Sequence, residues 1–282
     1  MKTSLFENRK LVIATMHQKE RVIAPVIESS LKVECLQVKD LNTDALGTFT
    51  GEIERKSDPI STARMKCQRA LEITGLDLAI ASEGSFGAHL DVFFAKADDE
   101  IVLLLDTKNQ IEIVGRKLSL ATNFDGATIH SWEEMKRFAG QALFPSHALI
   151  LRKAENSQDI YEKGITTWKQ LEDLCSKHLE NQGSVWVETD MRAMYNPTRM
   201  QVIQEATQQL VENVLSVCPI CSYPGFVVHE TKKGLPCALC HQPTRSVQSL
   251  MYLCKHCGHQ AFAPRKDGKT EEDPMYCDYC NP

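Results

Sequence analysis

The sequence predicts an α/β domain with a mixed sheet, followed by a long helix and a C-terminal module held together by paired cysteines. Two observations lead to this fold class. Short apolar runs alternate with segments whose apolar residues recur at helical spacing, as is typical of α/β domains. The end of the chain carries four Cys-x-x-Cys pairs. We expect the α/β domain at residues 1–196, the connecting helix at 197–217 and the cysteine module at 218–282.

The chain opens with a β-α-β pattern. Apolar runs at residues 11–15 and 33–38 predict two strands, and the segment 17–32 between them predicts a helix. The apolar residues at helical spacing in this segment are Val22, Ile23, Val26, Ile27 and Leu31. A polar stretch at 41–58 is too irregular for a core element.

The next helix is expected at residues 60–74, and Gly75 is expected to end it because glycine adopts a left-handed backbone without steric cost. An apolar strand at 76–81 follows and leads into the polar segment 82–87. The later apolar runs predict strands at 91–95, 101–106, 111–114, 147–151 and 185–188. Helical spacing predicts helices at 132–142, 168–179 and about 197–217.

Composition indicates an ordinary globular protein. Hydrophobic residues make up 43% and charged residues 24% of the 282 residues. No apolar run approaches the length of about eighteen residues that a membrane-spanning helix needs, and the apolar segment 11–16 is too short for the core of a secretory signal. We therefore expect a cytoplasmic protein without a membrane partner, in which the cysteines are reduced and bind metal instead of forming disulfides.

The paired cysteines predict metal sites. They are Cys218, Cys221, Cys237, Cys240, Cys254, Cys257, Cys277 and Cys280. Eight thiolates make two sites of four, the ligand set of structural zinc, and leave no coordination position for a substrate. We therefore expect two structural zinc ions in a double zinc ribbon.

Spacing leaves two ways to divide the four pairs between two zinc ions. Fifteen residues separate the first pair from the second and nineteen separate the third from the fourth, both typical of a zinc ribbon, so we favour sequential ligation by neighbouring pairs. Interleaved ligation, with the first pair joined to the third, stays open because thirteen residues also separate the middle pairs. His241, His256 and His259 are not needed as ligands, since the thiolates already fill both sites.

The charge of the cysteine module bears on its partner. The whole chain has a formal net charge of −5, and from Cys218 onward seven Lys and Arg residues stand against six Asp and Glu residues. Two zinc ions with eight thiolates take the module to about −3. Binding to a phosphate backbone normally needs clustered Lys and Arg, so this charge disfavours nucleic acid. RNA or a protein is the partner class that we expect for the zinc ribbons.

Polar segments after three predicted strands are candidate binding sites, because open α/β sheets bind ligands at the carboxyl ends of strands. Thr15 and Lys19 lie at a strand-to-helix turn, which favours an anion such as phosphate, although a helix cap with a surface lysine explains them as well. Glu83 lies among small residues and could hold Mg2+, or it could be a solvated loop acid.

The third polar segment, at residues 188–199, follows the strand at 185–188. Arg192 and Arg199 are suited to bidentate binding of phosphate or carboxylate. Asn196 stands before Pro197 and is expected to cap the long helix. We therefore propose Arg192 and Arg199, but not Asn196, as residues of this segment that bind an anionic ligand.

Four segments resemble a known signature in order. They are residues 14–19 (ATMHQK), 63–70 (ARMKCQRA), 74–76 (TGL) and 79–84 (AIASEG). Together they are similar to the inosine/xanthosine triphosphate pyrophosphatase superfamily. The resemblance implies an inosine-triphosphatase-like fold in which Thr15 and Lys19 contact phosphate, Lys66 lies on the substrate side of its helix and Glu83 binds Mg2+.

The chain departs from that signature at three positions. His17 and Thr62 stand where the family has asparagines, and Ser61 stands where it has a second metal-binding glutamate. Glu52 or Glu54 would supply that carboxylate if the polar stretch folds back.

The whole chain also resembles a bacterial family of unknown function. The matching segments are residues 47–55 (GTFTGEIER), 81–87 (ASEGSFG), 144–147 (FPSH), 185–192 (VWVETDMR), 196–200 (NPTRM) and 276–282 (YCDYCNP). This resemblance implies the architecture and supplies no function.

Two functional hypotheses follow. The first is a Mg2+-dependent nucleotide phosphoanhydride hydrolase with structural zinc. Its catalytic residues would be Glu83, Lys19 and Glu54, and its substrate would be bound by Thr15, Lys19, Lys66, Arg192 and Arg199. The second is a non-catalytic module that binds a nucleotide or RNA and docks a macromolecular partner through its zinc ribbons.

Overall fold

The computed structural model describes residues 5–38, 58–88 and 95–282. The chain divides into two compact units, Met1–Val211 and Glu212–Pro282. The expected alternation of strands and helices is confirmed as a mixed α/β architecture, although the strands form several sheets. Within the described residues, no helix combines the length and the apolar character that crossing a membrane requires.

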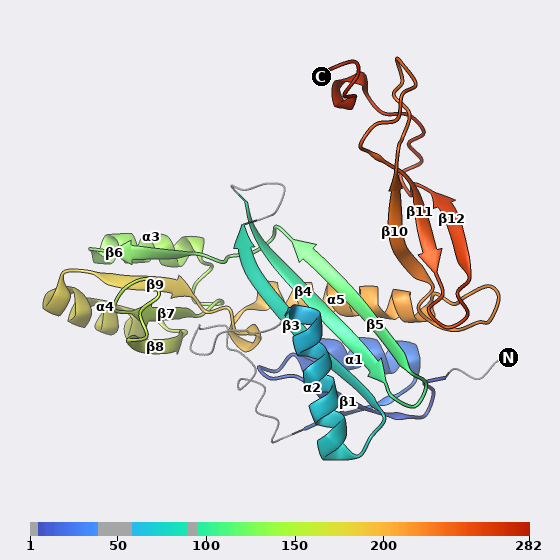
Figure 1. The fold of residues 1–282 in the computed structure, drawn as a ribbon. Coiled ribbons are helices and arrows are strands. Elements are labelled where there is room, and N and C mark those ends of the chain that lie inside the picture. The colour runs from blue at the N-terminus through green and yellow to red at the C-terminus, as the bar shows by residue number, and fades with distance from the viewer. Residues whose placement is uncertain (1–4, 39–57, 89–94) are drawn as a thin grey trace. The chain divides into compact units, whose positions relative to one another are not determined.

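The first sheet of the N-terminal unit has five strands in the order β2-β1-β3-β4-β5 (Figure 1). The strands are β1 Lys10–Ala14, β2 Glu34–Gln37, β3 Leu78–Ala88, β4 Lys96–Asp106 and β5 Ile111–Ser119. β1 runs parallel to β2 and β3, whereas β4 runs antiparallel to β3 and β5, so the sheet is mixed as predicted.

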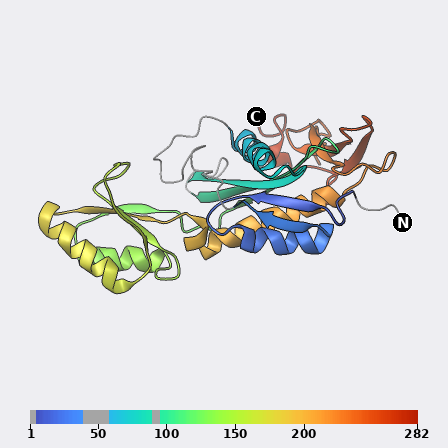
Figure 2. The ribbon, with the colours of Figure 1, turned by 90° about the horizontal axis from the view of Figure 1, so that it is seen from below.

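Helices cover both faces of this sheet (Figure 2). They are α1 Glu20–Leu31, α2 Pro59–Thr74 and α5 Pro197–Leu215. α2 packs on one face, where small buried residues such as Ala63, Cys67 and Ala70 contact the sheet; α1 and α5 lie on the other face. Gly115 of β5 lets α5 approach, because a Cβ there would lie 2.3 Å from the Ala206 carbonyl oxygen.

Capping residues explain where the helices begin and end. Asp58 accepts hydrogen bonds from the backbone amides of Ile60 and Ser61, and Pro59 follows it in the first turn of α2. Gly75 ends α2 at φ +67°, as predicted. Asn196 accepts a hydrogen bond from the Arg199 amide at 3.0 Å, which confirms its role as the cap of α5.

A second sheet in the same unit has four antiparallel strands in the order β6-β9-β7-β8. The strands are β6 Gly126–Ile129, β7 Leu149–Arg152, β8 Ile160–Ile165 and β9 Val185–Thr189. Helices α3 Trp132–Gln141 and α4 Trp168–Gln182 pack on one face of it and form a separate core with buried residues including Met135, Phe138 and Leu171 (Figure 2). A short 3₁₀ helix, Ala193–Tyr195, precedes α5.

Several expected elements have different bounds in the structure. Residues 82–87 are not a loop after a strand, because β3 continues through them to Ala88 while β4 pairs with it along its whole length. The helix expected from residue 17 begins at Glu20, since His17 and Gln18 have left-handed φ values near +60°. β6 and β8 were not expected. Residues 91–94 of the strand expected at 91–95 lie outside the described residues, as does the stretch 39–57.

The C-terminal unit is built on a three-stranded antiparallel sheet in the order β10-β11-β12. The strands are β10 Val227–Lys233, β11 Val247–Leu253 and β12 Gln260–Pro264, and a short 3₁₀ helix follows at Pro274–Tyr276. Sequence reasoning missed these strands because the sheet is largely exposed, with no row of buried apolar residues in β10.

Candidate functional site

The eight paired cysteines form two groups of four in the C-terminal unit. One group is Cys218, Cys221, Cys254 and Cys257, and the other is Cys237, Cys240, Cys277 and Cys280. The sulfur atoms of each group lie within 4.8 Å of one another. Four thiolates at about 2.3 Å from a tetrahedral zinc have sulfur–sulfur distances of about 3.8 Å. The contacts Cys218–Cys257 at 3.7 Å and Cys237–Cys280 at 3.8 Å fit this geometry.

The favoured sequential ligation is wrong. The first Cys-x-x-Cys pair shares a group with the third, and the second pair shares a group with the fourth. The antiparallel sheet explains the interleaving. The first pair precedes β10 and the third follows β11, and Val227 at the start of β10 is opposite Leu253 at the end of β11. The second pair follows the far end of β10. Seven extended residues span roughly 24 Å, so neighbouring pairs lie at opposite ends of the strand.

The backbone of each pair forms the same tight turn. The amide after the second cysteine bonds to the carbonyl of the first, as in Ser222 to Cys218 at 2.8 Å and Gly258 to Cys254 at 2.9 Å. The nearby histidines have other contacts: His256 stacks on Tyr223 and His259 on Phe226. As expected, the two donor groups found in the described residues consist of cysteines alone.

A cluster of buried charged side chains occupies the first sheet of the N-terminal unit. On the face covered by α2, Lys66 forms an ion pair with Glu83 of β3. On the opposite face, Arg199 of α5 donates from Nε to Oε1 of Glu100 at 2.6 Å, and both side chains are fully buried. The cluster of Lys19, Lys66, Glu83, Asp98, Glu100 and Arg199 is named the charged cluster below.

Lys19 lies at the start of α1, on the same face of the sheet as Arg199. Its ammonium donates to the Ser82 hydroxyl at 3.1 Å, and only 4% of the residue is exposed. Burial and the nearby Arg199 cation together lower the pKa of Lys19 to about 7. Burial raises the pKa of the Asp98 carboxyl to about 8, together with repulsion from Glu100. Both groups therefore titrate near neutral pH.

The structure brings together four of the residues that the sequence proposed for binding or catalysis. Lys19, Lys66, Glu83 and Arg199 belong to the charged cluster, although Glu83 lies inside β3 and not at a strand end. Thr15 follows β1, and its hydroxyl oxygen is buried. Glu54 lies outside the described residues.

Arg192 follows β9 of the second sheet. It bonds to Asp190 through Nε at 3.0 Å and through Nη2 at 2.6 Å, and its guanidinium lies over the Tyr195 ring. The three polar segments therefore do not follow strands of the same sheet. Thr15 and Glu83 belong to the first sheet, whereas Arg192 follows β9 of the second sheet.

Asp98 and Glu100 were missed by sequence reasoning. They alternate with Asp99 at the start of β4, ahead of the apolar run 101–106, and an acidic run before a strand is usually a solvated turn. The signal that could have found them is alternation, since residues two apart in a strand share a face. Asp99 faces the other way and pairs with Arg116.

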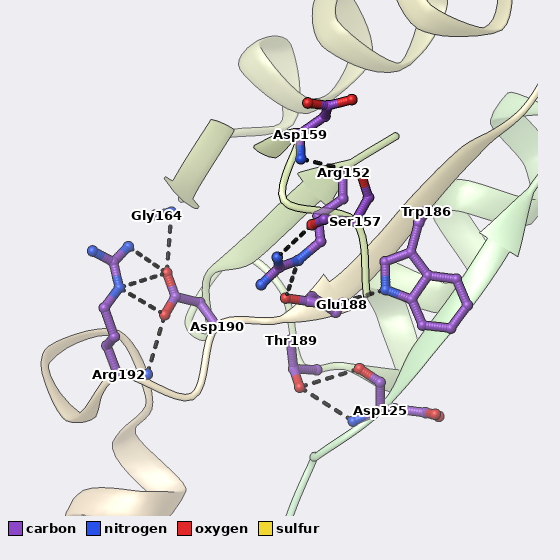
Figure 3. A network of polar contacts seen from close by, with 10 residues as sticks. All are labelled: Asp125, Arg152, Ser157, Asp159, Gly164, Trp186, Glu188, Thr189, Asp190 and Arg192. Atoms are coloured by element: carbon purple, nitrogen blue, oxygen red, sulfur yellow. Dashed lines mark hydrogen bonds and ion pairs between the residues drawn. The ribbon is translucent and has the colours of Figure 1, made fainter. Parts of the chain in front are cut away.

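A cavity of about 500 Å³ lies next to the charged cluster in the same unit. Its walls include the aromatic rings of Phe86, Phe124 and Trp186 and the cations Lys96, Arg152 and Arg192. Figure 3 shows the polar network along one wall, where Glu188 accepts from Arg152 Nε at 2.8 Å and from Trp186 Nε1 at 2.9 Å.

Asp190 is the centre of a second group of hydrogen bonds in this network. Its carboxylate accepts from Arg192 and from the Gly164 amide at 3.1 Å (Figure 3). Two residues connect the cavity to the charged cluster. Phe86 lines the cavity, and the centre of its ring lies 5.0 Å from the Arg199 guanidinium. Met191 also lines the cavity, and the Met191 carbonyl accepts a hydrogen bond from Arg199.

Comparison with known proteins places the chain in a family. Residues 66–282, well over half of the chain, match the family model described as "Domain of unknown function (DUF6671)". The chain belongs to this family. The DUF6671 match includes all eight zinc-site cysteines and Lys66, Glu83 and Arg199, while Thr15 and Lys19 precede it.

No curated protein matches this DUF6671 member. Among solved structures, the lipoprotein GNA1162 from Neisseria meningitidis is similar over 48% of this chain and 95% of that chain, with 10% sequence identity and a TM-score of 0.21. A TM-score this low does not indicate a shared fold.

Proposed function

We propose that the N-terminal unit binds a nucleotide in the cavity beside Trp186. The observation that carries this proposal is the combination of aromatic rings and ion pairs around a space of about 500 Å³, a volume typical of small-molecule sites. Phe124 and Trp186 offer faces on which a base can stack. Lys96 and Arg192 would bind phosphate in exchange for their present partners, Asp125 and Asp190. Nucleotide binding is common to both functional hypotheses from the sequence.

Hydrolysis of the bound nucleotide is the second candidate, and the charged cluster favours it. Five of the six ionisable side chains of this cluster are buried, which is costly, and groups with shifted pKa values such as Lys19 and Asp98 concentrate at functional sites. Lys19, Lys66 and Glu83 are residues for which the resemblance to inosine/xanthosine triphosphate pyrophosphatases implies phosphate and metal contacts. The ion pair of Lys66 with Glu83 supports an inosine-triphosphatase-like hydrolase in which Lys66 binds phosphate, and Lys19 lies on the opposite face of the sheet.

A magnesium ion at Glu83 does not fit the residues present. Glu83 is ion-paired with Lys66, so an ammonium already occupies the place that a cation would take at this carboxylate. The role that the geometry supports for Glu83 is to hold the Lys66 ammonium in position for phosphate.

For the C-terminal unit we propose that two zinc ions hold the fold and that its surface docks a partner. Ile220, Leu239 and Tyr279 occupy the same position in three of the four cysteine turns, and each is 69% exposed. Exposed apolar side chains together with a formal charge of about −3 favour a protein over RNA. A mobility-shift titration with structured RNA separates these partner classes.

A nucleoside triphosphate should stabilise the N-terminal unit against unfolding. The expected gain is RT ln(1 + [L]/Kd), about 2.7 kcal/mol at a hundredfold excess over Kd. Trp186→Leu should abolish the shift in melting temperature because it removes the stacking surface. Trp168→Leu is the matched control, because Trp168 lies at the start of α4 and does not line the cavity. A panel of common and deaminated nucleotides without any shift at millimolar concentration would contradict the proposal.

If the bound nucleotide is hydrolysed, Glu83→Gln should lower kcat by about 10²-fold, because misplacing a phosphate-binding group by about 1 Å costs that much. The measurement is phosphate or pyrophosphate release from inosine, xanthosine and common nucleoside triphosphates. Glu72→Gln, which alters an exposed ion pair with Arg69, is the control and should change nothing. Full activity of the Glu83 variant would remove this residue from the mechanism, and an inactive wild type would leave the binding function alone.

A further inference from the structure

The strongest unexplained feature of the molecule is a set of buried oxygen atoms without hydrogen-bond partners. Both carboxylate oxygens of Asp98, Oε2 of Glu100 and the hydroxyl of Thr15 have none in the described part of the chain. Asp98 is 1% exposed and Glu100 is 0% exposed. A buried carboxylate oxygen that has lost its water and gained no partner is strongly unfavourable, so these atoms indicate a ligand.

The unpartnered oxygens of Asp98 and Glu100 lie on one face of the first sheet, whereas Thr15 follows β1, two strands away. Asp98 and Glu100 are two residues apart in β4 and therefore point to the same side. They lie opposite Phe86 and Gly84 of β3. Thr15 leaves β1 immediately after Ala14, which is paired with Ala81, so it lies level with Ser82 on the same sheet.

Gly84 shows that the space around Glu100 is built into the fold. A Cβ at this position would lie 2.1 Å from Oε1 and 2.5 Å from Cδ of Glu100. Any other residue would push the carboxylate away from the sheet. The glycine thus keeps Glu100 flat against β3, where Arg199 holds Oε1 at 2.6 Å and leaves Oε2 for another group.

The chemistry of the donors defines the ligand. Asp98 and Glu100 offer three carboxyl oxygens that lack hydrogen-bond partners, beside the cations Arg199 and Lys19, and hard oxygen donors prefer Mg2+, Mn2+ or Ca2+ over softer metals. We propose that Asp98 and Glu100 bind a hard divalent cation of the Mg2+ type on the face of the sheet opposite Glu83. This site does not depend on the proposed nucleotide function.

Proton release provides a signature of this site. Without the cation, burial and repulsion from Glu100 raise the pKa of Asp98 to about 8, although the nearby cations Arg199 and Lys19 oppose this rise. A cation must displace the proton in order to bind the carboxylate. We therefore expect cation binding to release protons at pH 7, and this release should disappear as the pH rises well above 8.

The experiment is calorimetric titration of the full, zinc-loaded chain with Mn2+ and with Mg2+, without nucleotide, in two buffers that differ in ionisation enthalpy. The wild type should bind the cation and release the proton. Asp98→Asn should lose both properties while folding normally, because no hydrogen bond to its carboxylate is lost. Asp99→Asn is the matched control, since Asp99 is the neighbour that faces away and pairs with Arg116, and it should titrate like the wild type.

Three outcomes would overturn the proposal: no uptake of Mn2+ or Mg2+ by the wild type, equal uptake by Asp98→Asn, or equal loss in Asp99→Asn. The first would mean that Asp98 and Glu100 share a proton instead of a metal. Glu100→Gln is a second variant that should weaken binding of Mn2+ and Mg2+. The zinc content of each sample should be measured, so that a change at the cysteine sites is not mistaken for a change at Asp98 and Glu100. Because no nucleotide is present, failure here is distinct from failure of the nucleotide proposal.

Discussion

Combining Cys221→Ser with Cys257→Ser is expected to remove one zinc per chain, whereas combining Cys221→Ser with Cys240→Ser removes both. The reason is that Cys221 and Cys257 belong to one interleaved site and Cys240 to the other. Structural zinc of this type contributes an apparent binding free energy of about 10–16 kcal/mol, which is also folding free energy. Each lost metal should therefore unfold the turns that it holds. Elemental analysis of desalted protein gives the zinc content.

Cys35→Ser is the control for this series, because Cys35 lies in β2 outside both groups and should leave two zinc ions bound. Sequential ligation would reverse the results of the two double variants. Loss of both metals in every variant would mean that one empty site unfolds the whole unit. Cadmium NMR of the unmodified chain then decides, because the β protons of Cys218 and Cys254 should correlate with the same cadmium ion and those of Cys237 with the other.

Arg199→Met is expected to destabilise the N-terminal unit by about 3–5 kcal/mol. The guanidinium and Glu100 are both fully buried, and methionine fills much of the arginine volume but leaves the carboxylate without a counterion. The double variant Arg199→Met with Glu100→Gln should recover much of the loss, since it removes both charges. Denaturant unfolding followed by tryptophan fluorescence measures this unit alone, because Trp132, Trp168 and Trp186 all lie in it.

Arg116→Met is the matched control for Arg199→Met. Arg116 pairs with Asp99, one residue before Glu100 in β4, but its side chain is 61% exposed. An exposed ion pair contributes about 1 kcal/mol or less, so this change should have little effect. Equal losses in the two single variants would show that the buried pair has no special energetic role.

The sequence by itself was enough to find the metal ligands and much of the α/β pattern. Cys-x-x-Cys is a local motif whose two thiolates come from one turn, so no knowledge of the rest of the chain is needed to recognise it. Helix ends such as Asp58 and Gly75 are also local, because their side chains or backbone angles act within one turn. Lys19 and Glu83 were proposed from their places after predicted strands and Lys66 through a resemblance, and in the structure Lys66 and Glu83 form an ion pair.

Tertiary structure decided which pairs share a zinc, because that depends on the direction of β10 and β11 and not on spacing along the chain. It also decided that Glu83 lies inside a strand, since β4 pairs with β3 far beyond the apolar run. The buried state of Asp98 and Glu100 depends on α5, which is distant in sequence and brings Arg199 to them. Acidic residues at a strand start are usually solvated, and only packing from another part of the chain can remove their water.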